Sequence, residues 1–399
     1  MIRKKISEVL KGGLFTDGDW INSKDQDPDG EIRLIQLADI GDGVFINKSS
    51  RYINNATAKR LKCTFLKKGD VLVARMPDPL GRSCIFPLEG YQKYITAVDV
   101  CILRPDEEKV SNSYLSHMIN SPFNRSEIER QSTGTTRKRI TRKRLGNLEI
   151  PFPPLKTQEH IAGILDDAAA LRDKTAQLLE EYDLLAQSIF LEMFGDPAIN
   201  QKGWEMKKFD DVGEIARGKS QHRPRNAPEL LGGIYPLIQT GDIANSDGYI
   251  REYKSTYSEI GLAQSRLWPA GTLCITIAAN IANTGILTMD ACFPDSVVGF
   301  IPNEQTNNEF TQYWMSFLQK IIEANAPHVA QKNINLRILK ELDFFCPPIE
   351  LQNEFAEKIA LIEQQKELVR QELKECEDLF NCLLQKAFKG ELVPESQEV

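Results

Sequence analysis

The sequence lacks the short motifs that mark most enzymes. Its four histidines include no pair at metal-ligand spacing, and it contains neither a GxxxxGK[ST] loop nor a GxGxxG motif after a predicted strand. Its eight cysteines include no C-x-x-C pair, which favours reduced, mostly buried thiols over a disulfide framework or a zinc site. These absences predict a chain with no catalytic residues and no metal site of its own.

Long apolar runs and an overall positive charge are missing as well. The N-terminus MIRKKISEVLKGG is basic but lacks the apolar run of a signal peptide, and no window approaches the ~20 apolar residues of a membrane span. We therefore expect a cytoplasmic protein without a membrane partner. The formal net charge of -7 argues against indiscriminate coating of nucleic acid, but it permits local basic surfaces.

One long helix dominates what is present, in the stretch PFPPLKTQEHIAGILDDAAALRDKTAQLLEEYDLLAQSIFLEMFGDP at residues 151–197. Pro153 and Pro154 exclude helix before them, Thr157 is the expected N-terminal cap, and Gly195 is the expected stop. A second copy begins at Cys346 and aligns with the first at a constant shift of 194 residues. This length and repetition argue against the alternative of an incidental amphipathic helix on a globular domain.

Apolar or small residues recur along both helices in alternating steps of three and four, which predicts a coiled-coil seam. Arg172 and Lys366 interrupt the two seams at equivalent positions. We expect the helices to bury their apolar stripes on each other, antiparallel. The predicted seam residues are Ile161, Leu165, Ala168, Leu179, Tyr182 and Ile189 in the first helix, and Phe355, Ile359, Ile362, Val369, Leu373, Phe380 and Leu383 in the second.

The segments that precede the helices also repeat. Residues 34–36 (Leu-Ile-Gln) correspond to residues 237–239 at a shift of 203, and later matches settle at 194. Short strands rich in Val and Ile, bounded by Gly, Pro and Asp, are followed in each copy by a helical stretch. The sequence thus predicts an α/β (α+β) protein with two similar globular domains, separated and followed by long helices. The expected boundaries are 1–152 (first domain), 153–197 (central helix), 198–346 (second domain), 347–391 (C-terminal helix) and 392–399 (tail).

Basic residues gather in both predicted domains of this acidic chain. Arg side chains can contact phosphates and read guanine, and Gln and Asn side chains can read adenine, so these residues favour a DNA-binding role. A solvated basic loop would look the same in isolation. The candidate DNA-binding residues are Arg137, Lys138, Arg139, Arg142, Lys143 and Arg144 in the first domain, and Arg217, Lys219, Arg223, Arg225, Gln331, Lys332, Asn333 and Arg337 in the second.

A Gln three residues before an Asp occurs in both halves, as Gln36 with Asp39 and Gln239 with Asp242. These pairs could lie near a common functional face. The alternative is that each Asp only ties a turn, and we favour that interpretation.

Several strings in the chain resemble the DNA-specificity subunit of type I restriction-modification systems. They are the duplicated PPL-x-x-Q-x-x-I start of each helix (Pro153–Ile161, and Pro347–Phe355 with Phe in the last place), the central SIFLEMFGDP-x-x-N-x-KGW, the closing LLQKAFKGELV, and AQKNI at residues 330–334. The first half departs from AQKNI, with Thr136, Arg137, Lys138, Arg139 and Ile140 in its place. The resemblance covers almost the whole chain.

This resemblance implies a non-catalytic reader of double-stranded DNA. Each globular domain would be a target recognition domain that reads one half of a bipartite, asymmetric site. The helices would set the gap between the half-sites and dock two DNA-methyltransferase (modification) subunits. S-adenosylmethionine would bind to those partners, and restriction subunits, where present, would use ATP and Mg; no cofactor is expected in this chain.

Two other functions stay open at this stage. The chain could be a cytoplasmic coiled-coil scaffold that binds protein partners, with the basic segment serving solubility. It could also be an enzyme that acts on nucleic acid, which the missing catalytic motifs make the weakest of the three. Loss of salt-sensitive DNA binding after charge reversal of Arg137, Lys138 and Arg139 would separate the reader from the scaffold.

Overall fold

The computed structural model describes residues 2–134, 137–277, 283–318 and 335–392. The chain divides into two compact units: unit 1 consists of Met1–Ala176 and Gln371–Val399, and unit 2 of Gln177–Arg370. Each unit holds one globular part together with a portion of each of two long helices, α6 (Leu155–Phe194) and α12 (Ile349–Lys389).

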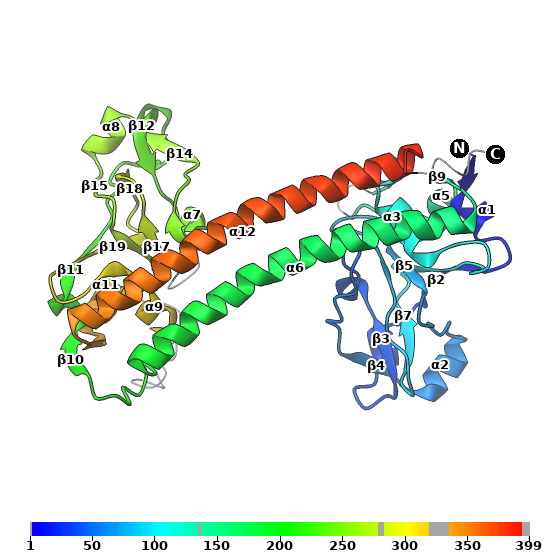
Figure 1. Ribbon diagram of the computed structural model, residues 1–399, viewed down its shortest axis with the longest axis horizontal. Helices are drawn as coiled ribbons and strands as arrows, with labels where there is room; N and C mark the ends of the chain where they lie inside the picture. The colour runs from blue at the N-terminus through cyan, green and yellow to red at the C-terminus, as the bar shows by residue number, and fades with distance from the viewer. Residues whose placement is uncertain (1, 135–136, 278–282, 319–334, 393–399) are drawn as a thin grey trace. The chain divides into compact units, whose positions relative to one another are not determined.

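The globular part of unit 1 contains short-stranded sheets and small helices (Figure 1). A four-stranded sheet has the order β2-β8-β5-β6, a three-stranded sheet has the order β4-β3-β7, and β1 pairs with β9. The strands are β1 (Arg3–Lys5), β2 (Leu14–Asp17), β3 (Ile32–Ile35), β4 (Arg51–Ile53), β5 (Val71–Ala74), β6 (Ser83–Ile85), β7 (Lys93–Thr96), β8 (Val100–Arg104) and β9 (Glu149–Pro151). The helices are α1 (Ile6–Val9), α2 (Asn55–Leu61), α3 (Asn112–Asn120), α4 (Pro122–Gln131) and α5 (Arg142–Gly146).

Strand β5 shows why this sequence forms a central strand. Its four residues, Val-Leu-Val-Ala, are all buried, and successive side chains point to opposite faces of the sheet. Val71 and Val73 belong to one core with α1 and α3, whereas Leu72 belongs to a second core with β3 and β7. Both faces of the sheet are therefore covered, which fits a continuous apolar run rather than an alternating one.

The globular part of unit 2 is built from the same kinds of element. Its sheets have the orders β11-β19-β16-β17-β13 and β14-β12-β18-β15, and β10 pairs with β20. The strands are β10 (Glu205–Lys208), β11 (Gly213–Arg217), β12 (Leu231–Leu237), β13 (Gly248–Ile250), β14 (Ser255–Tyr257), β15 (Leu267–Trp268), β16 (Leu273–Thr276), β17 (Thr284–Leu287), β18 (Ala291–Cys292), β19 (Val297–Pro302) and β20 (Asp343–Cys346). The helices are α7 (Thr240–Ala244), α8 (Glu259–Ala263), α9 (Asn308–Ser316) and α11 (Leu336–Glu341).

The two globular parts share a common strand order, to which unit 2 adds β13 at the edge of its larger sheet and β15 at the edge of its smaller sheet. The order β2-β8-β5-β6 in unit 1 recurs as β11-β19-β16-β17 in unit 2. In the smaller sheets, β3 pairs parallel with β7 and antiparallel with β4, and β12 pairs parallel with β18 and antiparallel with β14. The internal duplication predicted from the sequence is confirmed at the level of strand order and direction.

The long helices begin after Pro-Pro pairs and end at glycines, as predicted. Gly195 and Gly390 follow the two helices with φ of +83° and +84°, the left-handed conformation that glycine adopts without a steric penalty. The predicted cap at Thr157 is wrong, because α6 already begins at Leu155. The Pro154 carbonyl accepts hydrogen bonds from the backbone N–H groups of Thr157 and Gln158, so the proline itself starts the first turn.

A buried glutamine fixes each long helix to its own globular part. The side-chain amide of Gln158 donates to the carbonyls of Lys109 (3.1 Å) and Pro153 (2.8 Å), and its oxygen accepts from the Ser111 N–H (3.1 Å). In the second copy, Gln352 donates to the carbonyls of Gln305 and Pro347 and accepts from Thr306 and Asn307. The glutamine of the repeated PPL-x-x-Q string thus satisfies buried backbone groups in the loop before α3 and before α9.

The two long helices pair antiparallel within each unit. In unit 1 the first turns of α6 share a core with the last turns of α12, where Ile161 and Leu165 are buried with Leu384 and Ala387. In unit 2 the order is reversed, and the ring of Phe190 lies 5.6 Å from that of Phe355 between centroids. The predicted antiparallel coiled coil is confirmed.

The predicted seam residues differ in burial. Ile161, Leu165, Ala168, Phe355, Ile359, Ile362 and Val369 are buried, whereas Leu179, Tyr182, Ile189, Leu373, Phe380 and Leu383 are half-buried. The buried seam residues thus lie mostly where a globular part also packs against the helix pair.

Candidate nucleic-acid interface

The basic segment of unit 1 begins with a small closed loop. Thr133 and Arg139 exchange two backbone hydrogen bonds of 2.9 and 2.8 Å. Thr141 then caps the short helix α5 by accepting from the Arg144 N–H at 3.3 Å. The backbone N–H of Ile140 donates to the Arg75 carbonyl at 3.1 Å, so the segment is anchored where β5 ends.

The six charges of this segment fall into two groups. Lys138 contacts Glu129, Arg139 lies 2.8 Å from the Asp99 carboxylate, and Arg144 donates to the Gln131 carbonyl at 2.6 Å. Arg137, Arg142 and Lys143 are exposed and have no ion pair among the residues that the structure describes. The second group keeps its charge available for a partner.

The early basic loop of unit 2 follows strand β11. Arg217 and Lys219 are exposed. Arg223 and Arg225 both face one carboxylate, that of Asp295, at 3.9 and 2.7 Å. Two of the four predicted charges in this loop are therefore partly neutralised by Asp295.

The remaining predicted DNA-binding residues lie near the end of the second globular part. Arg337 is exposed on α11. Gln331, Lys332 and Asn333 fall outside the described residues. No contact to DNA is tested for any predicted residue, so these assignments stay predictions.

The repeated Gln and Asp residues serve turns. Asp39 is fully buried and accepts backbone hydrogen bonds from Gln36, Lys48 and Ser49, each at 2.7 Å. Asp242 accepts from the Gln239 N–H at 2.9 Å. The interpretation that these aspartates tie turns is the one that the hydrogen bonds support.

Two exposed aromatic side chains in unit 1 are not among the residues predicted from the sequence. Trp20 is 66% exposed and Tyr91 is fully exposed, although large aromatic side chains usually lie in cores or at binding surfaces. Tyr91 stands between Gly90 and Gln92, and this polar setting is the signal that could have identified it; Trp20, between Asp19 and Ile21, carries no comparable signal. Exposed aromatic rings can stack on bases or contact sugars.

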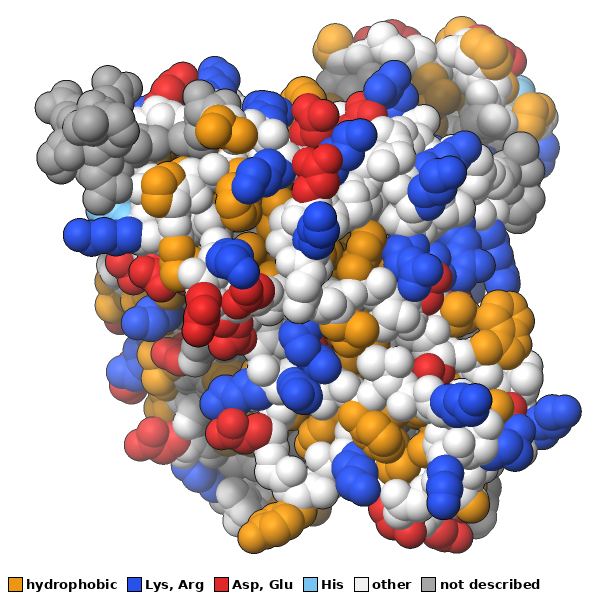
Figure 2. Space-filling view, turned by 90° about the vertical axis from the view of Figure 1, so that its right-hand side faces the viewer, with side chains coloured by type: hydrophobic (Ala, Val, Ile, Leu, Met, Phe, Trp, Pro, Cys, Tyr) orange, Lys and Arg blue, Asp and Glu red, His pale blue; other side chains and the backbone are white. Residues whose placement is uncertain are grey.

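Basic character is local on the surface. On the face drawn in Figure 2, Lys and Arg side chains are interspersed with Asp, Glu and exposed hydrophobic side chains. None of the helices that the structure describes is long and apolar enough to span a membrane. Within the described residues, no group of three or more His, Cys, Asp or Glu side chains could hold a metal ion.

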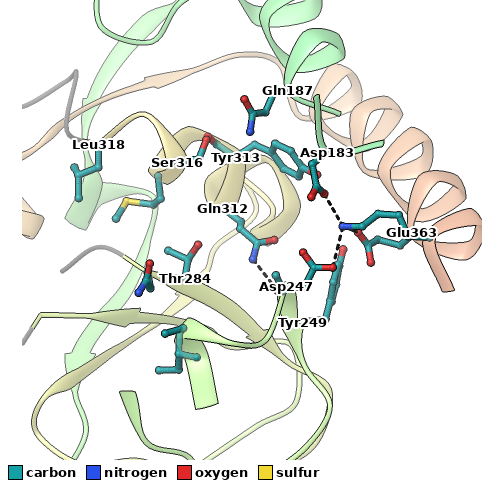
Figure 3. A pocket seen from close by; sticks show the side chains of 16 residues that line it. Asp183, Gln187, Asp247, Tyr249, Thr284, Gln312, Tyr313, Ser316, Leu318 and Glu363 are labelled. Atoms are coloured by element: carbon teal, nitrogen blue, oxygen red, sulfur yellow. Dashed lines mark hydrogen bonds and ion pairs between the residues drawn. The ribbon is translucent and has the colours of Figure 1, made fainter. Parts of the chain in front are cut away.

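The charge that interrupts the second seam is buried in unit 2. The Lys366 side chain is 3% exposed, and its Nζ lies 2.7 Å from Asp183, 3.0 Å from Glu363 and 3.2 Å from Asp247. Figure 3 shows Asp183 from α6 and Asp247 from the loop before β13 turned toward this position. Arg370 adds a further contact to Asp247. The lysine thus joins both helices to the globular part.

The charges around this lysine shift one another's pKa values. Burial alone would lower the pKa of Lys366, but its hydrogen bonds to Asp183 and Glu363 and the charge of Asp247 outweigh burial and raise it. Burial alone would raise the pKa of Asp247, and the hydrogen bond from Arg370 together with the charge of Lys366 lowers it instead. Lys366 and Asp247 therefore stay charged around neutral pH.

The equivalent residue of the first seam, Arg172 in unit 1, has different surroundings. Its side chain is 27% exposed, pairs with the neighbouring Asp173 at 2.7 Å, and lies over the Phe380 ring at 4.9 Å. Equivalent positions in the repeat thus carry a buried, multiply paired lysine in unit 2 and a half-exposed, stacked arginine in unit 1.

A row of exposed leucines lies on the helix pair of unit 2. Leu178 and Leu185 on α6 are 38% and 46% exposed, and Leu361 and Leu368 on α12 are 62% and 60% exposed. With the seam at heptad positions a and d, these residues take positions g and c, one side of the antiparallel pair. Asp183, Glu363 and Arg370 take position e, the side that contacts the globular part. The leucines therefore face away from the globular part.

Comparison with known proteins gives the same result for sequence and for fold. The family model described as the type I restriction modification DNA specificity domain matches residues 3–181 and 201–378. The putative type I restriction enzyme MjaX specificity subunit of Methanocaldococcus jannaschii is 22% identical, with 94% of this chain and 88% of the relative covered. The HindI specificity subunit of Haemophilus influenzae is 20% identical, with 90% and 94% covered.

Two solved structures share the fold. A chain from a study of complex assembly and conformational transition of the type I R-M system has a TM-score of 0.56 at 18% identity, with 97% of both chains covered. The type I restriction-modification S subunit from M. genitalium has a TM-score of 0.52 at 15% identity, with 99% of this chain and 96% of that chain covered. Because the two family matches span most of the sequence, this chain belongs to the family of the type I restriction modification DNA specificity domain and carries two copies of that domain.

Proposed function

We propose that this chain is the DNA-reading, non-catalytic subunit of a type I restriction-modification complex. The observation that carries the proposal is the pair of specificity-domain matches, at residues 3–181 and 201–378. Two domains of one topology with different basic residues suit a reader of two different DNA sequences. Each globular part would read one half of a bipartite, asymmetric site in double-stranded DNA.

The basic residues that keep free charge support this role. Arg142 and Lys143 in unit 1, and Arg217 and Lys219 in unit 2, are exposed. Arginine and lysine contacts to phosphates position a protein on DNA, and bidentate arginine contacts identify guanine. These side chains are the first candidates for such contacts, and the exposed Trp20 and Tyr91 are candidates for apolar contact with bases or sugars.

The long helices would set the gap between half-sites and dock two DNA-methyltransferase subunits. The exposed leucines at positions g and c in unit 2 support the docking role, since heptad-spaced apolar residues on a helix face suit helical partners. In this proposal S-adenosylmethionine binds to the methyltransferase subunits. Restriction subunits, where they join the complex, use ATP and Mg to translocate and cut DNA.

A genome-wide map of methylated adenines tests the proposal. Cells that express this chain with its neighbouring methyltransferase are compared with cells that lack only this chain. We expect a split motif with two unequal halves that appears only when the chain is present. An unchanged methylation pattern, despite a stable complex and an active methyltransferase, would refute the reader role and favour a scaffold.

Exchange of one globular part sharpens the test. Replacing residues 3–151 by those of a relative should change one half of the motif and preserve the other, because each domain would act alone. The matched control exchanges residues 205–346 and should change the opposite half. A change in both halves after either exchange would contradict the assignment of one half-site to each domain.

A further inference from the structure

The basic segment of unit 1 lines a cleft, whereas the alternative left open by the sequence was a solvated basic loop. This open cleft of about 590 Å³ lies at the end of the sheet β2-β8-β5-β6. The end of β2 supplies Asp17, and the residue after β5 is Arg75. Its lining includes the cationic side chains Arg75, Arg139, Arg142 and Lys143.

The protein holds two of these cations from behind. Arg75 is 5% exposed; its Nη1 lies 3.0 Å from Asp17, and its Nη2 donates to the Val98 carbonyl. Arg139 is held 2.8 Å from Asp99. The buried Nε atoms of both arginines have no hydrogen-bond partner among the described residues, so both guanidinium groups keep donor capacity.

The other two cations enter the cleft without a counter-ion. Arg142 and Lys143 are exposed on α5, and the structure records no ion pair for either of them among the described residues. Four positive charges around one open space face only the carboxylate of Asp17 in the lining. Like charges so placed repel one another, and an anion in the cleft relieves this repulsion.

The remaining walls suit a small, well-positioned anion. Ser7, Thr141 and Asn147 add polar groups, and Phe15 and Val98 form an apolar side. Gly146 permits this packing, since a Cβ at that position would lie 2.8 Å from the Phe15 ring. Such a mixture of hydrogen-bond donors and fixed cations is the chemistry that proteins use to hold phosphate groups.

Among the residues that the structure describes, unit 2 does not repeat this arrangement at the equivalent sheet end. The backbone N–H of Arg75 donates to the Asp99 carbonyl, and its counterpart in unit 2 is Ile277, which donates to Ser296. The Gly18 N–H donates to the Val100 carbonyl in unit 1, and the Gly218 N–H donates to the Val297 carbonyl in unit 2. The residues before these two glycines, Asp17 and Arg217, are therefore equivalent. Unit 2 therefore has the apolar Ile277 at the position of the buried Arg75. It has the exposed Arg217 at the position of Asp17, the carboxylate that pairs with Arg75 in unit 1.

From this geometry we propose that the cleft of unit 1 is a seat for one backbone phosphate of DNA, contacted by Arg139, Arg142 and Lys143 and preorganised by Arg75. This inference rests on the proposed function and adds an asymmetry to it. Unit 1 grips the backbone of its half-site through this cleft, whereas unit 2 presents different side chains at the same end of its sheet. Lys138 and Arg144, which point to other protein groups, do not contribute.

The test compares two double variants of the full chain in complex with its methyltransferase. Arg142→Gln with Lys143→Gln removes the two free cations of the cleft. Lys138→Gln with Arg144→Gln is the matched control, since it removes the same charge from the same segment. Affinity for the split-motif duplex from the methylation map is measured at several salt concentrations, and circular dichroism checks that both variants are folded.

The cleft variant is expected to bind roughly tenfold more weakly near physiological salt, and its salt slope (log K against log salt) should fall in magnitude by about 0.9, because the contact with one phosphate is lost. The control should change the slope by much less. Methylphosphonate linkages, which are neutral, are then placed one at a time along the duplex. One position in the half-site of unit 1 should weaken the wild-type complex but not the cleft variant.

Several outcomes would overturn the inference. Equal losses of DNA affinity in the cleft variant and the control would refute the phosphate seat. The same conclusion would follow if no methylphosphonate position had an effect that depends on Arg142 and Lys143. Competition by inorganic phosphate at millimolar concentration would assign the cleft to the free anion instead of DNA. A wild-type complex that binds no duplex at all would instead refute the proposed function, and the inference with it.

Discussion

Replacing Lys366 by Met tests the buried charge that joins the helix pair to the globular part of unit 2. Met keeps most of the aliphatic volume, so little packing is lost. The variant leaves Asp183, Glu363 and Asp247 without the ammonium group that lies 2.7 to 3.2 Å from each of them. We therefore expect an electrostatic loss rather than a cavity.

The size of this loss follows from burial. Removing one partner of a buried ion pair costs about 3–5 kcal/mol. The side chains of Asp183 and Asp247 are 48% and 49% exposed, so water will screen part of their repulsion, whereas Glu363 is 11% exposed. The expected destabilisation is thus near the lower limit, about 3 kcal/mol, which corresponds to a fall in Tm of about 6–12 °C for a unit of this size.

Tryptophan fluorescence during thermal unfolding of the full chain is a suitable assay, because Trp204, Trp268 and Trp314 lie in unit 2 and only Trp20 lies in unit 1. Arg172→Met is the matched control at the equivalent position of the repeat. Since Arg172 is 27% exposed and, within the described part of the chain, has an ion pair only with its neighbour Asp173, its loss should cost less than about 1 kcal/mol. Equal shifts in Tm for the two variants would refute the argument from burial.

Three further predictions concern pH, the helix starts and the helix surface. Burial raises the pKa of Asp19 to about 6, so the folded chain binds a proton more tightly than the unfolded chain, and the free energy of unfolding should fall as the pH rises from about 4 to about 6. Asp19→Asn should flatten that part of the profile in urea titrations, and an unchanged profile would contradict the assignment. Gln352→Ala leaves buried groups of the loop before α9 unpaired and should destabilise unit 2 by about 2 kcal/mol, whereas the matched Gln158→Ala should act on unit 1; denaturant unfolding followed by tryptophan fluorescence checks the difference. Leu361→Glu with Leu368→Glu should weaken co-purification of the methyltransferase without lowering Tm, whereas exposed Gln364→Glu should not; normal co-purification by the leucine variant would exclude this docking face.

The long elements were predictable because their signals are local and repeated. Pro-Pro pairs, terminal glycines and a regular apolar stripe predict two long helices whatever surrounds them, and the constant shift of 194 predicts that they are related. The first residue of α6 was misplaced, because Pro154 begins the first turn before the favourable capping residue Thr157. Strand β5 was equally clear, as four apolar residues follow a Gly-Asp turn.

The candidate site was less predictable because a basic residue in the sequence does not reveal which group it pairs with in the fold. The run from Arg137 to Arg144 reads as six equal cations in the sequence, but the fold brings Glu129 and Asp99 to two of them. Arg75 gave no signal at all, since its importance depends on where β2 and β5 end in space. Lys366 was recognised only as an interruption of the seam, and two of the three carboxylates around it, Asp183 and Asp247, come from distant parts of the chain.

The paired first and last strands of each globular part have a consequence for how genes of this family could change. β1 lies against β9, with Arg3 opposite Pro151, and β10 lies against β20, with Glu205 opposite Cys346. Both borders of each globular part therefore lie side by side, next to a helix whose sequence is repeated in the same chain. Genetic crossovers within the two repeated helix sequences would replace a complete globular part and leave its fastening to the helices intact. A new DNA specificity could then arise by exchange of a cassette, without a series of point mutations.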